Sequence, residues 1–218
     1  MKFKKILSIK DIKKLEIQEF KRRGNSFSLM KKAGTAAAKI ILKLTKKQPI
    51  IVVCGPGNNG GDGFILAEYL RKKDCEVDVF CLKKKYYSGD SLKAFKKLKI
   101  KVKDISDFKI RSKSIIIDCI FGSGLSRKIL GNLKDIIYKI NRSKKTIISI
   151  DIASGIHGDT GKIMGCAVRA NITLALHAKL IGQTLNPGKK YSGKIIVVGI
   201  GISKKFNYSW IWIKDIYD

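Results

Sequence analysis

Short apolar runs rich in isoleucine and valine recur along the chain, and segments with apolar residues at helical spacing separate them. The first run, residues 49–54, is almost wholly apolar and β-branched, which is typical of a parallel strand covered on both faces. Before it, residues 6–44 place apolar side chains at helical spacing, interrupted at residues 23–25 by Arg-Gly-Asn. The pattern predicts a helical lead-in of two segments, followed by a first strand.

Strands and helices alternate over the rest of the chain. Five more apolar runs have the length of strands, at residues 77–82, 115–118, 146–151, 172–176 and 195–198. Helices are expected at residues 64–70, 92–98 and 133–140. This alternation predicts an α/β protein with a doubly wound, mostly parallel, Rossmann-like sheet. A chain of 218 residues fits one domain, residues 1–218, on which the helical lead-in, residues 1–46, packs.

The polar residues of most interest follow the predicted strands, because parallel sheets bind ligands beyond the carboxyl ends of their strands. The first strand runs into CGPGNNGGDG, residues 54–63, and a helix follows. Glycine-rich backbone before a helix can present N–H groups to a phosphate. The loop lacks the Lys-Ser/Thr pair of a P-loop, but Asn58, Asn59 and Asp62 supply oxygens suited to a cation or to a ligand's hydroxyl and amide groups. A plain chain-reversing turn is the structural alternative.

Two other strand ends carry carboxylates. Asp118 closes an isoleucine-rich run and a Gly-Ser-Gly loop follows it, while Asp151 closes another run, with Ser154 close behind. A half-buried carboxylate is costly unless it is paired or bound to a metal, although Asp118 could also simply cap the turn after it. Together with Asn59, these groups could surround one ion.

The formal net charge of +29 would by itself favour a nucleic acid or an anionic membrane as partner. Lysines are spread over the whole chain, however, and isoleucine dominates the apolar positions, which indicates a compositional bias. A basic stripe with interleaved aromatic residues, the usual footprint of a nucleic-acid site, is not evident. We therefore expect neither a nucleic-acid nor a membrane partner.

The 5 cysteines form no CxxC pair and no cluster with histidine, so they are interpreted as reduced core residues. The N-terminal sequence has no signal-peptide pattern, and no apolar stretch is long enough to span a bilayer. We expect a cytoplasmic location.

In order, and over nearly the whole chain, these motifs resemble those of the NAD(P)H-hydrate epimerase family. The most specific element is NNGGDG, at residues 58–63. The matching stretches are residues 29–34, GPGNNGGDG at 55–63, DCIFGSGL at 118–125, DIASG at 151–155, DTG at 159–161 and NPG at 186–188.

The resemblance implies a three-layer α/β fold, usually dimeric, that interconverts the R and S forms of hydrated NADH and NADPH. This isomerase reaction is a step of nicotinamide-nucleotide repair. A potassium ion belongs to the family's site, and Asn59, Asp118 and Ser154 would be its ligands. The substrate would be held by Asn58, Asn59, Gly60, Gly61, Asp62, Gly122, Ser123, Gly124, Leu125, Ser126, Arg127, Lys128 and Asp151.

The resemblance also points to two catalytic residues. Asp151 would face the reacting ring as general acid and base, because inverting a hydroxyl-bearing carbon requires proton transfer while water or the ring bond leaves and returns. Lys179 would stand for a lysine of the family's late strand. That lysine normally lies two residues before a glycine, a place that Leu180 holds here before Gly182.

Domains of this family are often fused to an ADP- or ATP-dependent dehydratase. No dehydratase domain is expected within residues 1–218, so a separate dehydratase would be the functional partner.

The main alternative to the epimerase function is an RNA-binding or scaffold module on the same fold that has lost activity. A dinucleotide-dependent oxidoreductase ranks below it, because residues 83–85 are lysines where an acidic ribose contact would be needed.

Overall fold

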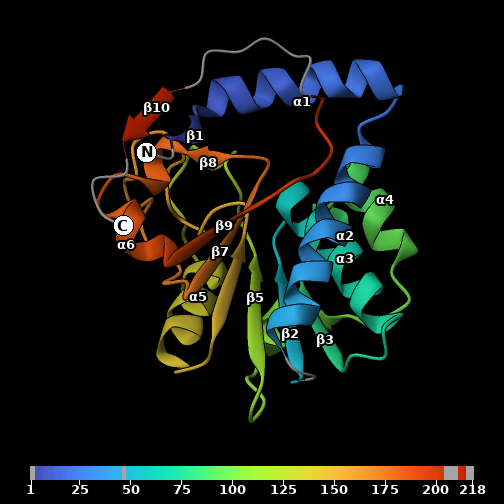
Figure 1. The fold of residues 1–218 in the computed structure, drawn as a ribbon. Helices are drawn as coiled ribbons and strands as arrows, with labels where there is room; N and C mark the ends of the chain where they lie inside the picture. Colours follow the sequence, from blue (N-terminus) through green and yellow to red (C-terminus); the bar gives the residue numbers. More distant parts are fainter. Residues whose placement is uncertain (1–2, 46–47, 204–210, 215–218) are drawn as a thin grey trace.

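The computed structural model describes residues 3–45, 48–203 and 211–214, and its core is a seven-stranded sheet (Figure 1). Every neighbouring pair in this sheet is parallel. In spatial order the strands are β4 (Lys103–Asp104), β3 (Val77–Cys81), β2 (Ile50–Cys54), β5 (Ile115–Cys119), β6 (Ile147–Ile150), β7 (Ile172–Leu176) and β9 (Lys194–Val198). The expected α/β class and parallel sheet are confirmed.

Helices cover both faces of the sheet, so the protein has three layers (Figure 1). Side chains alternate along β2: Val52 and Cys54 join one buried cluster, while Ile51 and Val53 join the other. The first cluster includes residues of α2 (Phe27–Leu44), α3 (Asn58–Arg71) and α4 (Gly89–Lys97), and the second those of α5 (Asn132–Arg142). A short α6 (Gly188–Ser192) precedes β9.

Helix α1 (Ile9–Arg23) lies across the carboxyl end of the sheet (Figure 1). The Ser8 hydroxyl accepts a hydrogen bond from the Asp11 N–H at 3.1 Å, which caps the start of the helix. Gly24 adopts a left-handed conformation, with φ of 73°, and ends it. The predicted break between the two lead-in helices is therefore confirmed.

The lead-in also contains a strand that the helical interpretation did not foresee, and residues 1, 2 and 46 of its expected range lie outside the described residues. β1 (Phe3–Leu7) pairs in parallel with β8 (Lys179–Leu180) and antiparallel with β10 (Ile211–Lys214) in a second, three-stranded sheet. The expectation of a purely helical start was wrong, because both partners of this strand are more than 170 residues away in sequence and leave no local signal.

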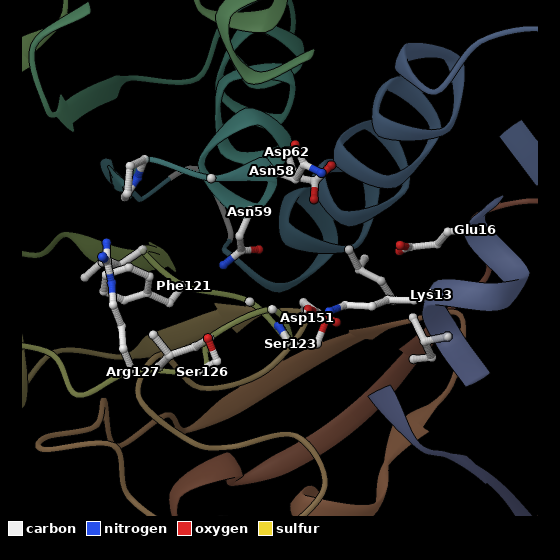
Figure 2. Close-up of a pocket in the computed structure, with 18 residues that line it drawn as sticks. Lys13, Glu16, Asn58, Asn59, Asp62, Phe121, Ser123, Ser126, Arg127 and Asp151 are labelled. Atoms are coloured by element: carbon white, nitrogen blue, oxygen red, sulfur yellow. Dashed lines mark hydrogen bonds between the residues drawn. The ribbon is translucent and has the colours of Figure 1, made fainter. Parts of the chain in front are cut away.

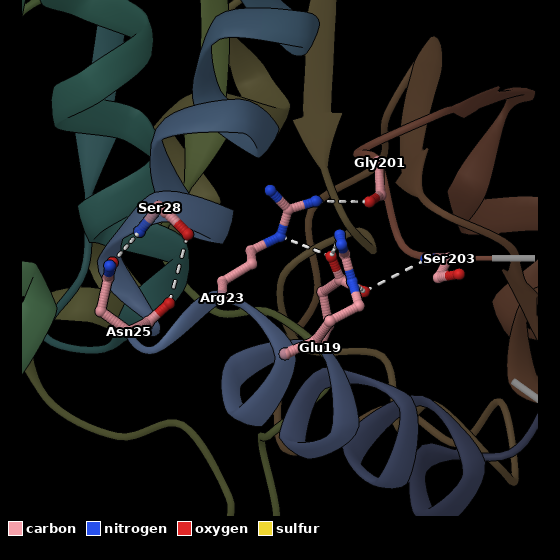
Figure 3. Close-up of polar contacts among 7 residues, drawn as sticks. Glu19, Arg23, Asn25, Ser28, Gly201 and Ser203 are labelled. Carbon is pink, nitrogen blue, oxygen red and sulfur yellow. Dashed lines mark hydrogen bonds and ion pairs between the residues drawn. The ribbon is translucent and has the colours of Figure 1, made fainter. Parts of the chain in front are cut away.

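The buried carboxylate of Glu19 anchors α1 to the segment that follows β9 (Figure 3). It forms an ion pair with Arg23 at 2.5 Å and accepts a hydrogen bond from the Ser203 N–H at 3.2 Å. Arg23 in turn donates to the Gly201 carbonyl at 2.6 Å. These contacts fix the helix over the strand ends.

The strand order reverses between β2 and β5, since the chain builds outward from β2 to β3 and β4 before it returns to β5 on the other side. The loops after β2 and β5 diverge at this switch point and leave a crevice, which is the usual ligand position in open parallel sheets. Among the described helices, none is long and apolar enough to cross a membrane.

Candidate nucleotide site at the sheet switch point

The loop after β2 passes directly into α3, whose first residue is Asn58. Gly55 lies so close to the neighbouring strand end that an added Cβ would stand 1.8 Å from the Ile120 carbonyl oxygen. Only glycine allows the two diverging loops to approach in this way. The open N–H groups and the dipole of the first turn of α3 point toward the switch point, as required for binding an anion.

Asp118, at the end of β5, is fully buried and fully hydrogen-bonded. Its two oxygens accept from the Ser149 hydroxyl at 2.7 Å, the Ser154 N–H at 3.0 Å, the Ser154 hydroxyl at 2.5 Å and the Ile120 N–H at 3.1 Å. Burial raises the pKa of this carboxyl, and the hydrogen bonds oppose that rise. Asp118 therefore ties the ends of β5 and β6 together, a larger role than capping its own turn.

Ser154 joins the same network to the next loop. Its hydroxyl accepts a hydrogen bond from the Phe121 N–H at 2.8 Å and lies 3.1 Å from the Phe121 carbonyl oxygen. Two of the three expected cation ligands, Asp118 and Ser154, are thus in direct contact.

Asn59 is the third expected ligand, and it differs from the other two. Both polar atoms of its side chain are buried and have no hydrogen-bond partner among the described residues. A buried amide without partners is costly, so this side chain fits a site that is completed by a bound group. Within the described part of the chain, no three His, Cys, Asp or Glu side chains group as a metal site, so a cation here would depend on amide, hydroxyl and carbonyl oxygens as well.

Asp151 follows β6 and points into the same region. Its backbone has φ of 69°, a left-handed conformation that costs energy in a residue other than glycine and often marks a functional position. One carboxylate oxygen, Oδ2, accepts a hydrogen bond from the Ser123 N–H at 2.7 Å. Burial raises the pKa of this carboxyl, and the bond from Ser123 opposes the rise. An added Cβ at Gly122 would stand 2.7 Å from Oδ2, so the loop needs glycine there.

A pocket of about 510 Å³ opens between α1, the start of α3 and the loops after β5 and β6 (Figure 2). This size suits part or all of a nucleotide ligand. The predicted residues that line it are Asn58, Asn59, Asp62, Gly122, Ser123, Gly124, Leu125, Ser126, Arg127 and Asp151. Most of the predicted substrate set is therefore brought together.

The remaining predicted residues lie outside the lining. Gly60 and Gly61 belong to the first turns of α3 and pack closely, Gly60 against the Gly55 carbonyl and Gly61 against the Met30 side chain. Lys128 follows the last lining residue of its loop. Lys179 lies in β8, where its register partner is Ile6 of β1. Its catalytic role stays a prediction.

Three polar residues that line or support the site were missed from the sequence. Lys13 and Glu16 line the pocket from α1, a helix that had been assigned only to packing. Gln183, almost fully buried, donates to the Asp151 carbonyl at 2.9 Å and accepts from the Leu180 N–H at 2.9 Å. An acidic residue beside the apolar Leu15 of the lead-in helix was the one signal that could have revealed Glu16, whereas Lys13 is exposed and left no such signal.

A second depression adjoins the pocket along the outer side of α1. The two share Lys13 and residues 123–126. Three more lysines of α1 line the depression, Lys10, Lys14 and Lys21, and all three are exposed. A lysine-lined extension of a nucleotide-sized pocket attracts anionic groups.

Together, the fold and the site define an α/β protein with a pocket at the switch point of a parallel sheet. The family described as YjeF-related protein N-terminus matches residues 26–182. The chain belongs to this family.

Curated relatives share this sequence over most of its length. It is 33% identical over 177 residues to the NAD(P)H-hydrate epimerase of Limosilactobacillus reuteri, covering 79% of this chain and 84% of that protein. It is 32% identical over 206 residues to the bifunctional NAD(P)H-hydrate repair enzyme Nnr of Thermofilum pendens, covering 88% of this chain. The match spans only 39% of that longer relative. Among solved structures, the yeast protein ynu0 (YNL200c) has the same fold, with a TM-score of 0.69, 21% identity and 83% coverage of each chain.

Proposed function

We propose that this protein is an isomerase that interconverts the R and S epimers of hydrated NADH and NADPH. The observation that carries the proposal is the position of Asp151, a half-buried carboxylate on a strained backbone that faces the pocket at the switch point. The relatives named NAD(P)H-hydrate epimerase support it, because the sequence match includes the strand ends that build this pocket.

The reaction inverts the carbon that carries the hydroxyl group, next to the ring nitrogen. A proton must reach the leaving oxygen, and another must be removed when water returns. Asp151 can do either, since burial keeps the pKa of its carboxyl above the ordinary value. Its hydrogen bond from the Ser123 N–H holds one oxygen in place and leaves the other for the substrate.

We further propose that a potassium ion is held by Asn59, Asp118 and Ser154, with backbone carbonyls completing its shell. The unpartnered buried amide of Asn59 and the buried carboxylate of Asp118 support this assignment. When bound, the ion would supply positive charge next to the carboxylates and would order the loops that line the pocket.

The substrate's diphosphate would lie at the start of α3 and along the loop of residues 122–128. The N–H groups of the helix start favour an anion there. Arg127 in the pocket and the lysines of the adjoining depression support an anionic dinucleotide as the ligand.

The direct test begins with one purified epimer of hydrated NADH and follows the appearance of the other by NMR. The wild-type protein should exchange the epimers far faster than buffer alone, and an Asp151→Asn variant should not. Exchange at the buffer rate with active-site residues intact would overturn the proposal. Tight RNA binding at physiological salt in such an inactive protein would favour the scaffold alternative, and that affinity should fall steeply as salt is raised.

We propose a homodimer as the working assembly, a separate ADP- or ATP-dependent dehydratase as the functional partner, and the cytoplasm as the compartment. The Nnr relatives, whose name describes a bifunctional repair enzyme, support the link to a second repair activity. The five free thiols, four of them buried, support a reducing compartment. Sedimentation velocity of the purified chain tests the dimer.

A further inference from the structure

A second carboxyl group faces the pocket from a different wall than Asp151. Glu16 lies on α1, its side chain is half-buried, and it lines the pocket together with Asp151 and Asn58 (Figure 2). It also lines a smaller cavity of about 250 Å³ beneath the helix, so its carboxyl stands where two cavities adjoin.

The charges around Glu16 come from three elements. Lys13 lies one turn earlier on the same helix, Asp62 faces it from α3, and Asp151 faces it from the loop after β6. The smaller cavity adds Asp90 of α4, whose charge is compensated by an ion pair with Lys93 at 3.0 Å.

This environment disfavours a negative charge. Burial, followed by the charge of Asp151, raises the pKa of Glu16 to about 7, and the Lys13 ammonium only partly opposes the rise. At neutral pH the Glu16 carboxyl therefore exists in both its protonated and its ionised form, which suits a group that both donates and accepts a proton. Among the described residues, the Glu16 carboxyl forms no ion pair or hydrogen bond, in contrast to Glu19 on the same helix. A structural contact therefore does not account for a glutamate at this position.

We infer that Glu16 is a second catalytic acid and base, which exchanges a proton with the substrate hydroxyl from the α1 wall while Asp151 does so from the strand-end wall. This inference rests on the proposed epimerase function. It assigns the two proton transfers of the reaction to two carboxyl groups on separate elements.

The step balances without any further reactant. Protonated Glu16 donates its proton to the C6 hydroxyl; the C6–O bond breaks, its electron pair leaves with water, and the ring nitrogen's lone pair forms a double bond to C6. Water then adds to the other face, the new C6–O bond forms, and ionised Asp151 takes the released proton. The reverse direction uses the same two groups in exchanged roles, so the singly protonated pair is the active form.

The experiment compares the pH dependence of epimer exchange in the wild type, Glu16→Gln and Glu16→Asp, with Asp107→Asn as a matched carboxyl-to-amide control at an exposed site away from the pocket. The wild type should show a bell-shaped profile whose alkaline limb falls near pH 7, because the Glu16 carboxyl, with a pKa of about 7, loses its proton there. In Glu16→Gln, the rate of epimer exchange should fall about 100-fold, since general acid–base catalysis contributes about 10²–10⁴-fold. The alkaline decrease near pH 7 should also be absent from the profile of this variant. Glu16→Asp should keep a bell-shaped profile, and Asp107→Asn should match the wild type.

A Glu16→Gln variant that exchanges epimers at the wild-type rate, with the alkaline limb unchanged, overturns the inference and leaves the proposed function standing. A second measurement avoids dependence on how the variants fold: ¹³C NMR titration of the Glu16 side-chain carboxyl in the wild type. Titration near 4.5, the ordinary value, would contradict the inference, and titration near 7 would support it. Absence of exchange in the wild type would overturn the proposed function and this inference with it.

Discussion

The Ser123 N–H donates a hydrogen bond to the Oδ2 atom of Asp151 at 2.7 Å, across 28 residues of sequence. This bond joins the loop after β5 to the loop after β6 on the pocket side of the switch point. It holds the carboxylate by a backbone group, so the position of Asp151 depends on the path of the loop and little on the Ser123 side chain. The position of this carboxylate is therefore set by the sheet.

Asp151→Asn should abolish epimer exchange, with a loss of about 100-fold or more, because an amide cannot transfer the proton. The variant keeps an oxygen that can accept from the Ser123 N–H, so its fold should be retained. NMR exchange measurements and circular dichroism of the same samples check both expectations. Undiminished exchange would remove Asp151 from the mechanism.

The same variant should be more stable than the wild type at neutral pH. Folding raises the pKa of the Asp151 carboxyl above 3.8, its pKa in the unfolded chain. The protonated carboxyl therefore contributes stability at pH values below 3.8, and this stability is lost as the pH rises through the pKa of the folded state. The amide has no such loss, so the Tm of the variant at pH 7 should exceed the wild-type value, as a thermal unfolding scan would show. The gain should shrink at acid pH, and a gain that grows on acidification would contradict this account.

Gln183→Leu should lower both stability and exchange rate. The leucine leaves the Leu180 N–H and the Asp151 carbonyl without their partner, at about 1–3 kcal/mol for each unsatisfied group. Urea unfolding should show a loss of about 2–6 kcal/mol, and exchange should slow about tenfold as the Asp151 backbone relaxes. Gln48→Leu, at an exposed glutamine, is the matched control and should change neither quantity.

Asn59→Ala should remove the response of the protein to potassium. In the wild type, replacing choline chloride by potassium chloride should raise the Tm by about 2–4 °C, since a cation that binds only the folded state stabilises it. Asn59→Ala should show the same Tm in both salts, whereas Asn132→Ala, at an exposed asparagine, should keep the difference. A wild-type protein that is indifferent to the cation would contradict the potassium assignment.

Glu19→Gln should weaken the docking of α1 over the pocket in a pH-dependent way. The hydrogen bond from Arg22 and the other contacts of this carboxylate lower its pKa from 4.5 to about 2. A depressed pKa contributes stability that is present above 4.5 and lost as the pH falls toward 2. The variant should therefore be less stable at pH 7 by about 2 kcal/mol and approach the wild type below pH 4. Urea unfolding at several pH values measures this, with the exposed Glu76→Gln as control.

Much of the fold could be predicted because its signals are local. The β-branched run ending at Cys54 and the isoleucine run ending at Asp118 both became central strands of the parallel sheet. The polar residues after them, including Asn59, met at one edge because parallel strands end on the same side. The order of the strands, and so the place of the switch point, could not be inferred from any single run.

The sequence alone determined the α/β class, the parallel sheet and the edge at which polar groups gather, since these follow from apolar periodicity and from the direction of parallel strands. Only the tertiary structure decided that α1 closes this edge and carries Lys13 and Glu16 into the pocket. The same holds for the small sheet around β1 and for the support of Asp151 by Gln183. These contacts join residues that are far apart in the chain, and their energy comes from packing and burial that a local pattern does not record.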